Sequence, residues 1–270
     1  MNRLPYWLLT CFTLVTGLFA ASPQAAVQGK EVTYSGDGLT MKGYLAWDDA
    51  VHGPRPGVLV VHEWWGHNDY ARQRARMLAE LGYTALAVDM YGDGKTAAHP
   101  KEAGAFAGAV RKNAASAKAR FLAAENLLKQ AGDVDAERIA ALGYCFGGSV
   151  VLDMARQGLP LKAVASYHGG LGTSAPASPG QIKARIISFS GEADPMIPAA
   201  QVADFKKEMT QAGADFTTVV YPGVKHSFTN PAADTYARDY GLPVAYDADA
   251  DHDSWAKTRV FLRDTLGSVK

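Results

Sequence analysis

Cysteine is scarce in this sequence of 270 residues, which contains only Cys11 and Cys145. Cys11 lies in an N-terminal apolar segment that we expect to be removed on export, so the mature chain keeps a single thiol. One thiol excludes an internal disulfide, even in an oxidising compartment. Cys145 is therefore either a buried apolar side chain or a reactive group.

An excess of charge of one sign is also missing. The 27 Lys and Arg side chains balance 27 Asp and Glu, so the formal net charge is zero. A protein that binds nucleic acid usually carries a basic excess or stripe that releases counterions from the phosphates. The sequence shows neither feature, and we expect no nucleic-acid partner.

A hydrophobic run long enough to span a membrane is absent, although the N-terminus differs from the rest. Arg3 precedes an uncharged apolar run over residues 8–21, which is shorter than the roughly 20 residues of a spanning helix, and small residues then lead to Ala26. We expect a signal peptide over residues 1–26, with an uncleaved anchor as the alternative. The remainder, 27–270, is expected to be one periplasmic or secreted domain without membrane contact.

Short apolar runs alternate with helical patterns along the remaining chain. We expect strands over 57–61, 83–88, 138–144, 161–167, 184–190 and 216–221, and helices over 69–81, 114–130, 147–157, 199–211 and 254–266. Residues 32–47 suggest an antiparallel hairpin at a sheet edge, and 173–180 and 229–253 are expected surface loops. The pattern predicts an α/β fold: a mostly parallel, doubly wound sheet with helices on both faces, in three layers.

The segment Gly143-Tyr144-Cys145-Phe146-Gly147-Gly148 joins an expected strand to an expected helix. It predicts a nucleophile elbow, a sharp turn in which Gly143, Gly147 and Gly148 leave room for strand and helix to approach. The helix start favours a thiolate at Cys145, and the backbone N–H of Phe146 is expected to face a developing oxyanion. The alternative is a tight crossing in which Cys145 merely fills a buried space.

An acid and a histidine follow Cys145 in the order that this architecture requires. Asp194 and His226 each come directly after a later expected strand, at the edge of the sheet where Cys145 is expected. His226 would take or share the thiol proton, and Asp194 would fix its tautomer. Asp194 could instead be a turn residue, with Glu192 as the rival acid, and His168 is the serious competitor of His226.

These motifs, together with His226-Ser227-Phe228 and Glu63-Trp64 after the first buried strand, resemble the dienelactone hydrolase family of the α/β-hydrolase superfamily. The resemblance implies an α/β-hydrolase fold and hydrolysis of carboxylic esters or lactones through a thioester acyl-enzyme, with neither metal nor organic cofactor. It also implies that Glu63 contacts the resting thiol and that the N–H of Trp64 completes the oxyanion hole.

Two arginines that hold the substrate carboxylate in the family's namesake align here with Asp93 and Asn230. Neither side chain binds an anion as Arg does. Lys95 and Lys225 lie nearby in the sequence and are possible substitutes. Alternatively, a neutral or aromatic ester would suit an apolar pocket lined by Trp64, Trp65, Phe146, Met196 and Phe228.

Two segments resemble metal-binding motifs but lack residues or spacings that those motifs require. His62 and Glu63 begin like a metalloprotease helix, but His67 falls one residue too late and the segment leaves a strand. The alternating acids Asp247, Asp249, Asp251 and Asp253 lack the glycine and closing Glu of a calcium loop, and we interpret them as solvated acids before a helix.

Two other functions stay open at this stage. A peptidase or acyltransferase can use the same fold and triad, because function depends on the pocket. A binding or redox-sensing protein would oxidise Cys145 without ever acylating it. Such a sensor has no need of Asp194 and His226 in register with the thiol, so we favour the hydrolase.

Overall fold

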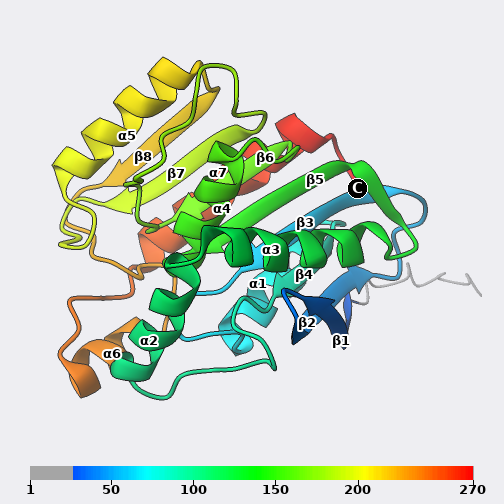
Figure 1. Ribbon diagram of the computed structural model, residues 1–270, viewed down its shortest axis with the longest axis horizontal. Helices are drawn as coiled ribbons and strands as arrows, with labels where there is room; N and C mark the ends of the chain where they lie inside the picture. Colours follow the sequence, from blue (N-terminus) through cyan, green and yellow to red (C-terminus); the bar gives the residue numbers. More distant parts are fainter. Residues whose placement is uncertain (1–26, 270) are drawn as a thin grey trace, which may run out of the picture.

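The structure of the protein is a computed structural model that describes residues 27–269. Within this range, eight strands form one sheet in the order β1-β2-β4-β3-β5-β6-β7-β8 (Figure 1). The strands are β1 (Val27–Gly36), β2 (Leu39–Asp48), β3 (Arg55–Val61), β4 (Thr84–Val88), β5 (Val134–Tyr144), β6 (Ala163–Tyr167), β7 (Arg185–Gly191) and β8 (Phe216–Tyr221). The predicted signal peptide lies outside the described residues.

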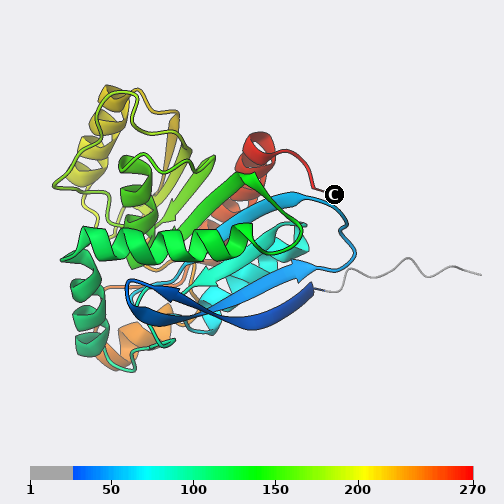
Figure 2. The same ribbon diagram turned by 45° about the vertical axis from the view of Figure 1, so that its right-hand side comes forward.

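The sheet is parallel except at one edge. β3 to β8 run parallel, whereas β2 pairs antiparallel with β4 and β1 pairs antiparallel with β2. The expected hairpin therefore forms the edge of the sheet, and Figure 2 shows its long twisted strands. The predicted mostly parallel, doubly wound α/β sheet is confirmed.

Helices cover both faces of the sheet. They are α1 (Asp69–Glu80), α2 (Pro100–Arg111), α3 (Ala114–Lys129), α4 (Phe146–Arg156), α5 (Ala199–Ala212), α6 (Ala233–Tyr240) and α7 (Ala248–Leu266). One apolar core lies under α2, α3, α4 and α5, and another lies under α1 and α7. β3 serves both cores, because Leu59 and Val61 belong to the first and Val58 and Val60 to the second.

Two parts of the chain differ from the sequence prediction. Helix α2 was not expected; it starts at Pro100 behind His99, whose ring accepts the N–H of Lys101. The prediction of a surface loop over 229–253 is wrong, because this range contains α6 and the first turns of α7.

The prediction that four solvated acids precede the closing helix is wrong for three of them. Asp247 caps α7 by accepting the N–H of Ala250, while Asp249, Asp251 and Asp253 lie inside the helix. Asp251 is buried rather than solvated, because Arg74 binds it at 2.6 Å. That pair spans 177 residues of sequence, so local patterning gives no sign of it.

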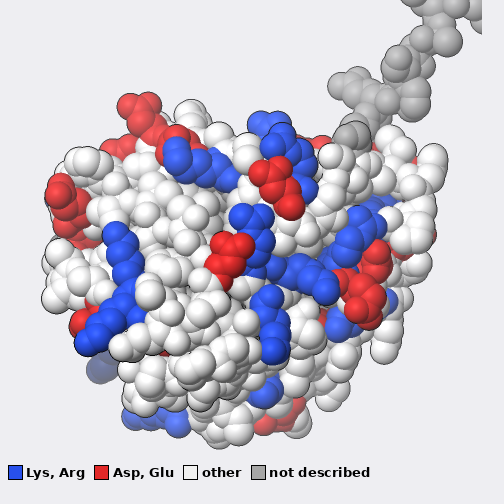
Figure 3. All heavy atoms as spheres, turned by 90° about the horizontal axis from the view of Figure 1, so that it is seen from above, with Lys and Arg blue, Asp and Glu red and all other residues white. Residues whose placement is uncertain are grey.

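Charges are mixed on the surface seen in Figure 3, where Lys and Arg side chains alternate with Asp and Glu. Among residues 27–269, no helix is both long enough and apolar enough to cross a lipid bilayer.

Candidate active site

Cys145 occupies the turn between β5 and α4 in a backbone conformation that is rare for a residue with a side chain. Its φ is 52° and its ψ is −113°. A positive φ of this kind costs free energy and persists only where the surroundings impose it. The turn therefore stores strain at the one thiol of the described chain.

The glycines around Cys145 explain why this turn can form. A Cβ at Gly143 would lie 2.1 Å from the carbonyl oxygen of Gly147, and one at Gly147 would lie 2.2 Å from that of Val61. A Cβ at Gly148 would approach Ser166 Oγ at 2.7 Å. Since these contacts are too short for real atoms, β3, β5 and the start of α4 can pack together only without side chains there.

Two backbone N–H groups are available beside Cys145. Phe146 is the first residue of α4, so its N–H has no carbonyl partner within the helix. Trp64 lies in the loop after β3, and the N–H of Gly147 ties α4 to that loop by donating to the carbonyl oxygen of His62 at 3.1 Å. Within residues 27–269, neither Phe146 nor Trp64 uses its N–H in a backbone hydrogen bond of the loops and caps.

His226 and Asp194 meet at the ends of β8 and β7. The Nδ1–H of His226 donates to Asp194 Oδ2 at 2.7 Å, and Asp194 Oδ1 accepts the N–H of Met196 at 2.8 Å. Both side chains are almost wholly buried, while Nε2 of His226 has no hydrogen-bond partner among the described residues. The rival acid Glu192 is exposed and accepts the N–H of Gly223 instead.

The electrostatics favour a charged imidazole at His226. Burial alone would lower its pKa, but the neighbouring Cys145 and the hydrogen bond to Asp194 raise it to about 10. An imidazolium beside Cys145 stabilises a thiolate, so the surroundings of His226 suit an ion pair.

The carboxylate of Glu63 is hydrogen-bonded to side chains other than the thiol of Cys145. Its two carboxylate oxygens accept hydrogen bonds from Ser227 Oγ at 3.1 Å and from Asn230 Nδ2 at 2.5 Å. Burial raises the pKa of Glu63, whereas the bond from Asn230 and the charge of His226 lower it. No hydrogen bond links Glu63 to Cys145 in the described part of the chain, so the contact implied by the resemblance would require this carboxylate to reorient.

His168, the competing histidine, has no acid partner among residues 27–269. Its Nδ1 accepts the N–H of Cys145 at 3.1 Å, and its Nε2 lies 2.8 Å from Thr229 Oγ1. Burial and the charge of His226 lower the pKa of His168 well below its usual value. It therefore stays neutral and binds the backbone N–H of Cys145 rather than a carboxylate.

Cys145 and His226 line one cavity of about 150 Å³. Its walls are mostly apolar, and Trp65 stacks on Tyr236 with ring centroids 4.2 Å apart. The lining residues are Trp64, Trp65, Arg111, Cys145, Met196, His226, Ser227, Tyr236, Leu242 and Val244.

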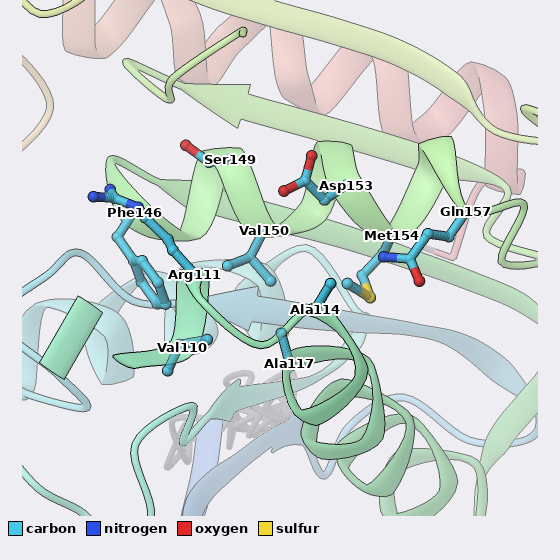
Figure 4. A pocket seen from close by; sticks show the side chains of 10 residues that line it. All are labelled: Val110, Arg111, Ala114, Ala117, Phe146, Ser149, Val150, Asp153, Met154 and Gln157. Carbon is cyan, nitrogen blue, oxygen red and sulfur yellow. The ribbon is translucent and has the colours of Figure 1, made fainter. Parts of the chain in front are cut away.

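Two aromatic residues expected in this lining lie elsewhere. Phe146 lines a neighbouring cavity of about 50 Å³ between α4 and the ends of α2 and α3 (Figure 4). Phe228 is fully buried against the ring of His168, with centroids 5.2 Å apart.

Arg111 lines both cavities and is the cation that sequence reasoning missed. Its guanidinium lies 5.7 Å from the centre of the Phe146 ring, and Figure 4 shows the side chain reaching past that ring toward the start of α4. Lys95 pairs with Asp93 at 3.9 Å, and neither it nor Lys225 lines the cavity. Arg111 escaped notice because it ends α2, a helix that the sequence pattern did not predict.

Metal binding finds no support in the described residues, where no cluster of three or more His, Cys, Asp or Glu side chains is arranged to hold an ion.

Comparisons with known proteins agree with one another. The family model for the dienelactone hydrolase family matches residues 41–266. A putative carboxymethylenebutenolidase of Methylorubrum extorquens is 30% identical over 223 residues, covering 78% of this chain and 72% of that protein. A probable 2-oxo-3-(5-oxofuran-2-ylidene)propanoate lactonase of Bradyrhizobium is 27% identical over 242 residues, covering 84% of this chain and 90% of that protein. The crystal structure of a dienelactone hydrolase-like promiscuous phosphotriesterase from metagenomic libraries superposes with a TM-score of 0.82 at 32% identity, covering 90% of this chain and all of that one.

Proposed function

This chain belongs to the dienelactone hydrolase family, and from that premise we propose that it cleaves its substrate with Cys145 as nucleophile, His226 as base and Asp194 as orienting acid. The family and its lactonase relatives make it a hydrolase of esters or lactones. One observation carries the proposed triad: Cys145 shares a cavity with His226, whose other ring nitrogen is bound to Asp194 at 2.7 Å.

In the first half-reaction the Cys145 thiolate attacks the carbonyl carbon of the substrate. The carbonyl oxygen becomes an oxyanion that the N–H groups of Phe146 and Trp64 stabilise. When this intermediate collapses, the C–O bond to the alcohol breaks and the His226 imidazolium protonates the departing oxygen. A thioester on Cys145 and a neutral His226 remain.

Water completes the cycle. Neutral His226 removes a proton from water as the oxygen attacks the thioester carbonyl, and the same N–H groups hold the new oxyanion. Collapse expels the thiolate, releases the carboxylic acid and restores the imidazolium, which Asp194 keeps oriented through Nδ1.

The negative charge of Glu63 supports the same ion pair from below. It is buried near His226, and an anion there favours the imidazolium over the neutral ring. Ser227 and Asn230 hold this carboxylate in place, so in our proposal Glu63 acts on the resting site through its charge.

The residues that line the cavity favour a substrate with an apolar body and with an anionic group that would lie beside Arg111. Tryptophan, tyrosine and aliphatic side chains supply the apolar walls, and Arg111 is the one cation besides the His226 imidazolium among the residues found to line it. Arg111 is exposed and forms no ion pair within the described chain, so its charge is free for a carboxylate.

Export remains part of the proposal. Residues 1–26 have the features of a signal peptide, which would deliver the hydrolase to the periplasm or outside the cell. A reporter enzyme fused after residue 40, active only outside the cytoplasm, should be active with residues 1–26 present and inactive without them.

A stoichiometric burst experiment tests the catalytic proposal. Purified mature protein is mixed with p-nitrophenyl acetate, and nitrophenol release is followed beside a Cys145→Ser variant. A burst of about one equivalent, followed by turnover and absent in the variant, supports an acylating Cys145. The redox-sensing alternative would be favoured if the protein has a titratable thiol but gives no burst, and if hydrogen peroxide then converts Cys145 stoichiometrically to sulfenic acid.

A further inference from the structure

A chain of buried polar groups runs from the backbone of Cys145 to Arg74 and Asp251, and the proposed mechanism does not use it. His168 and Thr229 are both 0% exposed. Thr229 Oγ1 lies 2.8 Å from His168 Nε2 and 2.6 Å from the hydroxyl of Tyr70. Arg74 then donates from Nε to that hydroxyl at 3.2 Å.

Arg74 fixes the outer end of this chain. Its Nη2 donates to the carbonyl oxygen of Thr229 at 2.7 Å and to Asp251 Oδ1 at 2.6 Å. The guanidinium also lies over the rings of Tyr70, Tyr144 and Trp255, at 5.2 to 5.8 Å from their centres. Arg74 of α1 therefore holds the backbone of Thr229, and Asp251 of α7 holds Arg74 in place.

The hydrogen bonds determine the tautomer of His168. A backbone N–H can only donate, so Nδ1 of His168, facing the N–H of Cys145, must be unprotonated. The ring proton is then on Nε2, where it donates to Thr229 Oγ1. The other neutral tautomer or a doubly protonated ring would set two donors against each other at Cys145. The protonated ring would also add a charge next to His226, whose ring centre is 5.0 Å away.

From these contacts we propose that His168 is a positioning residue for the nucleophile. Its Nδ1 holds the N–H of Cys145 and so maintains the strained elbow that aims the thiol at His226, while Thr229 holds the proton on Nε2. The N–H of Cys145 is shared with the carbonyl oxygen of Tyr167 at 2.9 Å, so His168 supplies one of two acceptors. The inference rests on the proposed function only for its catalytic consequence.

Three variants separate positioning from simple packing. His168→Phe fills the space but has no acceptor, whereas His168→Asn can offer its Oδ1 near the position of Nδ1. Thr229→Val keeps the shape of Thr229 and removes the acceptor of the His168 Nε2–H. Thr218→Val is the matched control, because Thr218 loses a comparable hydroxyl bond, from Ser188 Oγ at 3.0 Å, in the strand β8.

The readouts are kcat and KM with p-nitrophenyl acetate and the rate at which iodoacetamide alkylates Cys145. We expect His168→Phe and Thr229→Val each to lower kcat and the alkylation rate about 10-fold with KM little changed, because the reacting sulfur is misplaced. His168→Asn should stay within about 3-fold of wild type, and the Phe/Val double variant should be no worse than either single variant. Thr218→Val should change neither rate.

Two results would overturn the proposal: a folded Thr229→Val or His168→Phe protein with wild-type alkylation, or an Asn variant as impaired as the Phe variant. If His168→Phe does not fold, the isosteric Thr229→Val protein decides. Alkylation requires no ester hydrolysis, so a wild-type protein without acyl burst but with altered alkylation in the variants would refute the proposed function and leave this inference standing.

Discussion

Asp194 accepts the Nδ1–H of His226 at 2.7 Å in a region where both side chains are nearly inaccessible to water. The pair joins two loops that follow adjacent strands, β7 and β8, and leaves Nε2 of His226 facing the cavity of Cys145. Its geometry leads to the first of five predictions.

Replacing Asp194 by Asn should lower kcat by roughly 10³-fold or more, because an amide no longer favours the imidazolium and can stabilise the wrong tautomer. Asp215→Asn, which alters an exposed ion pair with Arg185, should leave kcat within 2-fold in the same steady-state assay. Equal effects of the two substitutions would contradict a role for Asp194.

The pH dependence of stability should carry the signature of His226. Its pKa is raised from 6.5 to about 10 in the folded protein, so the folded state binds a proton that the unfolded state releases between these values. The resulting stabilisation is complete below about pH 6.5 and is lost as the pH rises to 10. Urea unfolding should show a steeper fall in stability toward pH 10 for wild type than for His226→Gln, and parallel curves there would disprove the assignment.

Two glycine substitutions should have opposite effects. Gly147→Ala places a Cβ 2.2 Å from the carbonyl oxygen of Val61 and should cost about 3 kcal/mol or more of stability. Gly108 lies in α2 with nothing within 4 Å of an added Cβ, so Gly108→Ala should stabilise the protein by about 1 kcal/mol. Thermal unfolding of the two variants measures both; a stable Gly147→Ala protein would refute the close approach of α4 to β3.

The amide of Asn230 should matter because it serves a buried carboxylate. Asn230→Ala leaves an oxygen of Glu63 without its donor, which should cost about 1–3 kcal/mol in chemical unfolding. Asn126, exposed on α3, is the control, and its replacement by Ala should not destabilise the protein. If both substitutions behave alike, the Glu63–Asn230 bond contributes nothing to stability.

Arg111 should select anionic substrates. We expect Arg111→Gln to raise KM about 5-fold for mono-p-nitrophenyl glutarate, the exposed position limiting the ion pair to roughly 1 kcal/mol, and to leave KM for p-nitrophenyl butyrate unchanged. High salt should reduce this difference in wild type. Lys95→Gln serves as the control, since Lys95 lies outside the cavity; a loss that affects both esters equally would rule out charge recognition.

The sequence predicted best what local patterns encode. The continuous apolar run of β3 indicated a strand covered on both faces, and it lies between β4 and β5 with cores on either side. The glycines around Cys145 indicated the elbow, because the close packing there depends on the absence of side chains. These signals sufficed for the fold class and the family.

Contacts between residues that are far apart in the sequence could not be predicted in the same way. Asp251 looks like a solvated acid until Arg74, on another helix, is placed against it. Arg111 and Tyr236 gain their importance only where α2 and α6 meet the loop after β3, and neither helix was expected from the sequence. Glu63 likewise depends on Ser227 and Asn230, which are more than 160 residues away.

Part of the cavity wall comes from a different stretch of the chain than the reacting groups. Cys145, Asp194 and His226 follow three sheet strands, whereas Tyr236 and Leu242 come from α6 and the loop behind it. Substitutions in α6 and the loop behind it can therefore change which substrates the enzyme accepts while the catalytic residues stay unchanged. A protein with this architecture can therefore evolve toward new substrates without replacing its catalytic residues.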